Sequence, residues 1–219
     1  MTSKPQELKE KITTDFEIRK KAFHDAIAKT QTQIDAVTVE IAKLRADLKT
    51  QAAEAKTKTL AGIEEATKQL DAARKEQQDM IEAHLKALRT DVEAINAALK
   101  NATAAGKTAV EAKAKAVREE YASARSALTA SLDAELAEWK VRIGATVDAA
   151  AEKKADAKTA VEAKIADLHV KYEAAQKKLD ALKQADAAAF NELHRGVQTA
   201  IGEVKTALQH ARKNIAAAS

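Results

Sequence analysis

The chain has 219 residues with one proline, five glycines and no cysteine, which excludes disulfides and thiolate metal sites. Alanine fills 53 positions, charged residues make up 32% and aromatic residues only 3%, a composition that favours thin, close helix packing over a thick globular core. The net charge is +4, but its 37 basic and 33 acidic residues are interspersed, which argues against specific nucleic-acid binding.

The first predicted helix begins close to the N-terminus. Ser3 is suited to cap a helix, Pro5 to occupy its first turn, and Gln6 to complete the cap. Downstream, apolar residues recur seven apart, with others at the alternate three- and four-residue steps. This is the seam of a helix that packs along another helix. The seam residues are Ile27, Thr30, Ile34, Val37, Ile41, Leu44 and Leu48.

The apolar stripe continues through the rest of the chain and predicts an all-α protein. It returns in Leu85, Leu88, Val92, Ile95 and Leu99, and again in Val161, Ile165, Leu168, Tyr172, Ala175, Leu179 and Leu182. In a third stretch the steps are closer to an 11-residue repeat, which predicts straight or weakly coiled packing. These residues are Leu128, Leu132, Leu136, Trp139, Ile143 and Val147.

An internal repeat of about 51 residues runs through the chain. Thr-Ala-Val-Glu-Ala-Lys occurs at Thr108–Lys113 and again at Thr159–Lys164, and Trp139 matches Phe190 at the same offset. We interpret the chain as one elongated helical domain made of about four degenerate copies. The predicted copies cover residues 6–54, 57–104, 107–155 and 158–216.

Three alanine-rich windows between the copies are candidate turns. The main turn is expected near 101–107, where Thr108 and Glu111 form a capping box that restarts a helix. A second capping box, Thr159 with Glu162, supports a turn near 148–158. If only the central window turns, the chain is a long antiparallel helical hairpin. If all three turn, it is an elongated four-helix bundle or coiled coil.

The residue pattern predicts no enzyme, no cofactor and no metal site. The five histidines are the first candidates for metal ligands, but none has a glutamate three residues before it, as bundle metal sites require. His169 and Glu173 are spaced as half a site, and we interpret them as a surface polar pair. Phosphate loops, nucleophile elbows and zinc-protease motifs are also missing. The histidines are His24, His84, His169, His194 and His210.

The closing segment, 185–215, is the candidate partner or lipid face. Its apolar residues, together with Trp139 earlier in the chain, either fill a core or anchor a partner helix or a bilayer. Nearby positive charges, among them Arg195 and Lys205, would suit an anionic surface. The expected partners are further copies of the chain, other helical proteins, or a peripheral membrane or lipid surface. The face consists of Phe190, Leu193, Val197, Ile201, Val204 and Leu208.

The expected location is the cytoplasm, with the periphery of a membrane as the alternative. Residues 1–11 are polar and charged, unlike a secretory signal. Nor does any window approach 18 uncharged apolar residues, so no transmembrane span is expected.

The second half of the chain resembles small bacterial coiled-coil stress-response proteins over residues 131–215. The likeness is carried by Trp139-x3-Ile143, Tyr172, Ala189-Phe190-x-Glu192-Leu193 and Gly196. It implies a helical protein linked to stress, with no catalytic residues. The whole chain also has a looser likeness to amphipathic lipid-associated proteins of the apolipoprotein or phasin kind.

Overall fold

The computed structural model describes residues 4–50, 53–101, 104–151 and 155–217, and it is all-α. Apart from 185–189, every residue in these ranges is helical, and no strand occurs among them. This confirms the predicted fold class. The helices are α1 (Lys4–Thr50), α2 (Ala53–Asn101), α3 (Ala104–Ala151), α4 (Ala155–Gln184) and α5 (Phe190–Ala217).

The chain divides into two compact units, Met1–Leu128 and Thr129–Ser219. The boundary lies within α3, so this helix contributes its first half to unit 1 and its second half to unit 2. Each unit is described by itself below. Within the described residues, none of the helices combines the length and hydrophobicity that crossing a membrane requires.

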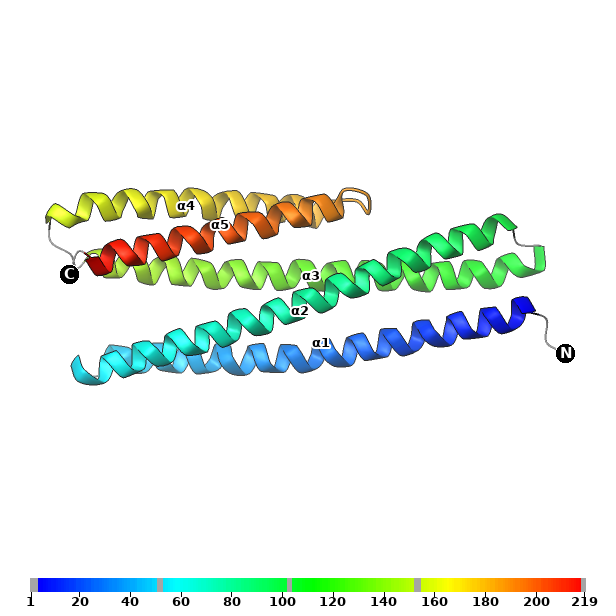
Figure 1. Ribbon diagram of the computed structural model, residues 1–219, viewed down its shortest axis with the longest axis horizontal. Helices are drawn as coiled ribbons and strands as arrows, with labels where there is room; N and C mark the ends of the chain where they lie inside the picture. The colour runs from blue at the N-terminus through cyan, green and yellow to red at the C-terminus, as the bar shows by residue number, and fades with distance from the viewer. Residues whose placement is uncertain (1–3, 51–52, 102–103, 152–154, 218–219) are drawn as a thin grey trace. The chain divides into compact units, whose positions relative to one another are not determined.

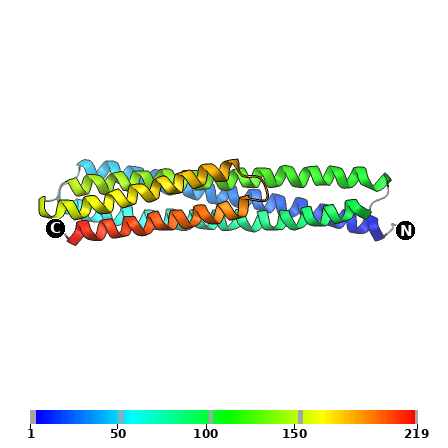
Figure 2. The same ribbon diagram turned by 90° about the horizontal axis from the view of Figure 1, so that it is seen from above.

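In unit 1, α1 and α2 lie side by side along much of their length, as Figure 1 and Figure 2 both show. Three contacting pairs define their register. Partner numbers fall along α2 as they rise along α1, and Gly62 faces Leu44 further along in the same order. The pairs are Arg19 with Asp91, Phe23 with His84, and Gln31 with Gln77.

The core of this helix pair is made by the predicted stripe. Ile34, Ile41, Ala66 and Leu70 form a buried cluster, with Val37 and Leu44 partly buried against it. The remaining α1 seam residues, Ile27, Thr30 and Leu48, are also buried or half-buried. Because each deeply buried apolar side chain contributes about 1.5–3 kcal/mol, this thin seam supplies much of the stability of the pair.

In unit 2, α4 and α5 lie side by side. The stripe of α4 points into this unit, where Leu168, Ala175, Leu179 and Leu182 are fully buried. The second half of α3 joins the same unit through Lys183 on α4, whose Nζ lies 2.8 Å from Asp133 Oδ1.

The fourth predicted copy, 158–216, is interrupted by a break at 185–189 that the sequence analysis does not predict. Asp186 causes the break by capping a new helix. Its Oδ1 accepts hydrogen bonds from the backbone N–H groups of Ala188, at 2.9 Å, and Ala189, at 2.8 Å. An N-cap aspartate of this kind satisfies donors that a helix start would otherwise leave without partners. Four long helices therefore become five helices in the described residues.

Two other predictions about helix boundaries are wrong. Thr108 and Thr159 lie inside α3 and α4, whose first described residues are Ala104 and Ala155, so neither capping box starts its helix. An alanine-rich sequence extends a helix upstream of a potential cap, because adding each alanine to the helix costs little free energy. Pro5 lies in the first turn of α1, as predicted, whereas Ser3 falls outside the described residues. The two-helix hairpin is also wrong, because α1 and α2 are separate helices that pack on each other.

Candidate functional site

A buried carboxylate on α3 joins three helices of unit 1. Glu120 Oε1 lies 2.9 Å from His24 Nε2 on α1 and 3.0 Å from His84 Nε2 on α2. Its other oxygen, Oε2, lies 3.4 Å from Lys20 Nζ on α1. The Glu120 side chain is only 3% exposed and that of His84 only 7%. We refer to Lys20, His24, His84 and Glu120 as the Glu120 cluster.

Local helix geometry explains how these four residues meet. His84 and Glu120 both stand on the buried stripes of their helices, after Ile81 on α2 and Val117 on α3. Lys20 and His24 are four residues apart on α1, so they share one face of that helix. His84 and Glu120 are 36 residues apart, and each lies at nearly the same distance from its helix end, Asn101 of α2 and Ala104 of α3. Helix packing therefore brings them to the same level.

Phe23 closes the apolar side of the cluster. Its ring stacks on the imidazole of His84, with centroids 3.9 Å apart and an interplanar angle of 11°. It also meets the His24 ring edge-on at 5.3 Å. An aromatic ring against an imidazole excludes water and fixes the orientation of the ring nitrogens. The stack thus holds His84 Nε2 toward the carboxylate.

Burial and hydrogen bonding set the charge of the two central groups. Desolvation is the largest influence on the pKa of Glu120 and raises it, but the hydrogen bonds from His84, His24 and Lys20 together outweigh it and leave the pKa below its usual value. Burial lowers the pKa of His84, although the hydrogen bond to Glu120 opposes the shift. At neutral pH Glu120 is therefore a carboxylate. Since a carboxylate only accepts, His84 must carry a proton on Nε2 and donate it to Glu120.

Arg19 and Asp91 extend the polar contacts between α1 and α2. Arg19 Nη2 donates to both carboxylate oxygens of Asp91, at 3.0 and 2.8 Å. Lys113 on α3 has a buried Nζ with no hydrogen-bond partner in the structure. Burial lowers the pKa of Lys113, with a partly opposing attraction from Asp91. Both features belong to the packing of unit 1.

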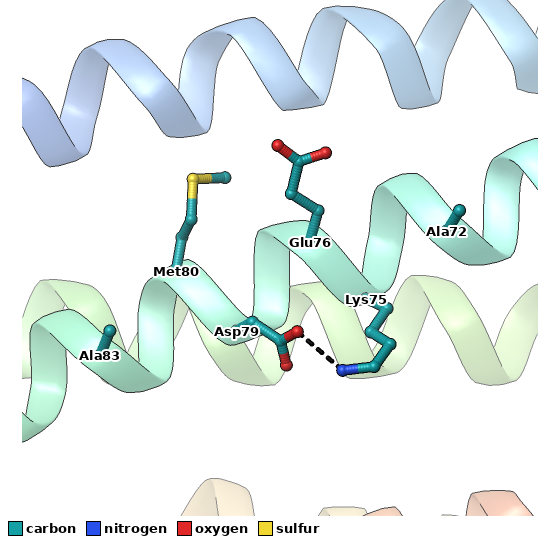
Figure 3. Close-up of a pocket in the computed structure, with 6 residues that line it drawn as sticks. All are labelled: Ala72, Lys75, Glu76, Asp79, Met80 and Ala83. Atoms are coloured by element: carbon teal, nitrogen blue, oxygen red, sulfur yellow. Dashed lines mark hydrogen bonds and ion pairs between the residues drawn. The ribbon is translucent and has the colours of Figure 1, made fainter.

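A shallow, open depression lies along α2. Figure 3 shows the ion pair on its lining, in which Lys75 Nζ approaches Asp79 Oδ2 at 2.7 Å. The hydrogen bond to Asp79 raises the pKa of Lys75. All the lining residues come from one helix face, and the two charged partners are well exposed, so the depression offers no converging set of groups to a ligand. It is lined by Ala72, Lys75, Glu76, Asp79, Met80 and Ala83.

The predicted partner or lipid face of the closing segment is largely buried. Phe190 is 1% exposed, and Val197, Ile201, Val204 and Leu208 are also buried. Leu193 is half-buried. These residues lie on α5, which packs along α4. An α5 that contacts a bilayer through this face would first have to separate from its neighbours.

The histidines fall into different environments. His169 and His210 are exposed, and His194 is buried in unit 2. The sequence pattern places His24 and His84 on separate helices and does not predict that they bond to the same carboxylate. Among the described residues, no group of three or more potential ligands is arranged to hold a metal ion.

Trp139 is buried in unit 2 and is tied to its own helix. Its Nε1 donates to Glu135 Oε1 at 3.3 Å, and the Arg142 guanidinium lies 4.4 Å from the ring centroid. Of its two predicted roles, core residue or anchor for a partner, the position of Trp139 in the described residues is that of a core residue.

No family model, curated protein or solved structure matches the chain. The function must therefore be inferred from the chemistry of the Glu120 cluster and the helix faces. Glu120 and the imidazoles could exchange protons, but their bonds are directed at one another and the carboxylate is almost inaccessible. The arrangement is suited to joining helices and responding to protonation.

Proposed function

We propose that this chain is a non-enzymatic structural protein that acts through its helix surfaces. In this proposal it is an antiparallel bundle built from about four 51-residue repeats, which associates with copies of itself or with other helical proteins. The observation that carries the proposal is the Glu120 cluster. Glu120 and His84 are buried, and Lys20 and His24 bond to the same carboxylate from α1, so these acid and base groups hold three helices together.

The exposed helix surfaces support an association role. Single large apolar residues lie among charged residues of both signs on the surface. Each can contact another helix, but together they do not form a contiguous hydrophobic patch. Several i,i+4 ion pairs, such as Lys68 with Glu64 and Lys171 with Asp167, keep the surrounding faces solvated. The exposed apolar residues are Ile18, Val39, Leu60, Val141 and Val170.

Sedimentation equilibrium over a range of protein concentrations tests self-association. The expected result is a mass that rises with concentration above the 23.5 kDa of a single chain. A mass that stays at one chain at all concentrations would contradict self-association. A variant with Val39 and Val170 replaced by Ser removes exposed apolar contacts while leaving the buried stripe intact, and it should associate more weakly than the parent.

A lipid- or granule-coating role is the second candidate. It is favoured by the unusually complete apolar face of α5, which runs from Phe190 to Leu208, with Arg195 and Lys205 on the same helix. Binding requires α5 to expose that face by leaving α4. Flotation with neutral and with anionic vesicles at low salt is the test. Co-flotation would favour coating, and failure to float with either vesicle would exclude it.

Two substitutions show whether α5 makes the lipid contact. Replacing Phe190 and Ile201 with Asp places charges on the buried face and should abolish flotation. Because the same change also disrupts packing, the melting temperature must be measured alongside. A double variant that melts like the parent and still floats would show that α5 is not the contact.

A cytoplasmic location and a role under stress complete the proposal. The role under stress is supported by the resemblance to coiled-coil stress-response proteins over 131–215. Imaging a tagged chain in cells before and after heat or oxidative stress is the measurement. Redistribution or accumulation under stress is expected.

A further inference from the structure

The Glu120 cluster has a charge balance that depends on pH. At neutral pH it holds one anion, Glu120, and one cation, Lys20. Acidification adds a proton to His84 and finally removes the charge of the Glu120 carboxylate. The imidazolium of His84 would then share the site with the Lys20 ammonium without an anion to offset them, and because the His84 side chain is only 7% exposed, water screens their repulsion weakly.

We propose that the Glu120 cluster is a pH-operated latch that holds the first half of α3 against α1 and α2 at neutral pH and releases it in acid. The geometry supports this because one carboxylate bonds to both other helices at once. Removing its charge weakens the α1–α3 and α2–α3 contacts together. This regulation of unit 1 is independent of the partner proposed above.

The surroundings of the cluster reinforce the release. The charged or titratable groups that act on Glu120 and His84 are Arg19, Lys20 and His24 from α1, besides the two groups themselves. Arg19 is already paired with Asp91 on α2, so it adds positive potential without supplying an anion to the cluster. Because Asp91 is engaged by Arg19, none of the groups named for Glu120 and His84 supplies a second anion to the cluster.

The lowered pKa of His84 fits this device. Burial lowers the pKa of His84 in the closed unit, so His84 takes up a proton more readily once α3 moves away and water reaches its ring. Proton uptake therefore favours the open form. The opened surface would include Phe23 on α1 and Val117 on α3, both of which are buried at neutral pH.

The distance between α2 and α3 tests the latch directly in the full chain. The protein has no native cysteine, so spin labels can be placed at Lys86→Cys and Ala122→Cys, both exposed positions in unit 1. Electron–electron double resonance in buffer with EDTA should give one narrow distance distribution at pH 7.5. At pH 3.5 it should broaden and lengthen by about 10 Å, the width of a helix. An unchanged distribution at pH 3.5 would overturn the proposal.

Two variants separate the latch from general acid unfolding. His24→Gln with His84→Gln keeps amide donors for Glu120 but removes both imidazoles. In the parent, opening should begin as the pH falls below about 6.5, the ordinary histidine pKa. In this variant, opening should begin only in the carboxylate range, at about pH 4. The matched control is His169→Gln with His210→Gln, two exposed histidines outside the cluster, which should open like the parent. Equal midpoints for the two double variants would overturn the proposal.

Glu120→Gln removes the charge while keeping the shape of the side chain. It should show a broadened α2–α3 distance already at pH 7.5, with helix content by circular dichroism close to that of the parent. A narrow distribution at pH 7.5 in this variant would show that the carboxylate charge does not hold α3.

Discussion

The ring of Phe23 on α1 stacks face to face on the imidazole of His84 on α2, with centroids 3.9 Å apart. This contact joins the apolar seam to the buried polar cluster, because His84 bonds to Glu120 with the nitrogen that the stack orients. In unit 1, the Phe23–His84 stack and the His84–Glu120 bond therefore lie next to each other where the three helices meet. The two contacts should respond to mutation together.

Replacing Phe23 with Ala should destabilise unit 1 by about 3–5 kcal/mol, the usual cost of deleting a buried phenylalanine ring. Water that enters the space would also relieve the burial of His84 and raise its pKa toward the ordinary value. Urea unfolding measures the first effect, and NMR titration of the imidazole measures the second. Ile18→Ala, at an exposed position on the same helix, should change stability by no more than about 0.5 kcal/mol.

The free energy of unfolding should decrease as the pH falls below 6.5, the ordinary pKa of histidine. The pKa of His84 is lowered in the folded state, so the unfolded chain binds this proton first and acid favours unfolding. The pKa of Glu120 is also lowered from 4.5. Its stabilisation is therefore present above that value and is lost as the pH falls through the folded pKa.

Urea unfolding at several values between pH 7.5 and 3.5 checks this dependence. In the variant His84→Gln the decline just below pH 6.5 should become shallower, while the decline below 4.5 should persist because Glu120 is still present. Stability that increased on acidification of the parent would contradict both assignments.

Replacing Leu179 with Ala should destabilise unit 2 by about 2–5 kcal/mol, since this α4 side chain is completely buried and its removal leaves a cavity. Val170→Ala is the matched control on the same helix, because Val170 is 66% exposed. The control should melt within a few degrees of the parent. If both variants melted alike, α4 would not bury its stripe as the structure describes.

Replacing Asp186 with Ala should destabilise unit 2 by about 0.5–2 kcal/mol through loss of the cap on α5. Asp186→Asn retains an oxygen that can accept from the Ala188 and Ala189 N–H groups, and it should lie close to the parent. Hydrogen exchange of these two amides is the local measurement, and it should accelerate in the alanine variant alone. If the two amides exchanged in the alanine variant as slowly as in the parent, Asp186 would not cap the helix.

Sequence periodicity by itself determined which residues are buried within each helix. Ile34 and Ile41 on α1, Leu88 on α2 and Leu168 on α4 were predicted from spacing alone and are buried. The physical reason is local: a 3.6-residue helix carries residues three and four apart onto one face, whatever that face later contacts. The strong helix propensity of alanine, lysine and glutamate determined the fold class in the same way.

The tertiary structure alone decided which faces meet and which polar residues they enclose. His24, His84 and Glu120 come from three helices, and no spacing between them forms a motif. A signal was available, because a glutamate on an apolar stripe needs partners, and His84 is as far from the end of α2 as Glu120 is from the start of α3. To use that signal, one must know which helices are neighbours and how they are aligned along their axes. Both depend on side-chain contacts between segments far apart in the chain.

The break at 185–189 is a second feature that the local sequence does not decide. Asp186 and Phe190 are a recognisable helix start, with Ala185 and Phe190 in the positions of a hydrophobic staple. The surrounding alanines and lysines, however, favour continuing the helix. Local propensities that nearly balance cannot choose between one helix and two. The packing of α5 along α4 makes the choice, because only a reversal of the chain lets both stripes bury their apolar residues against each other.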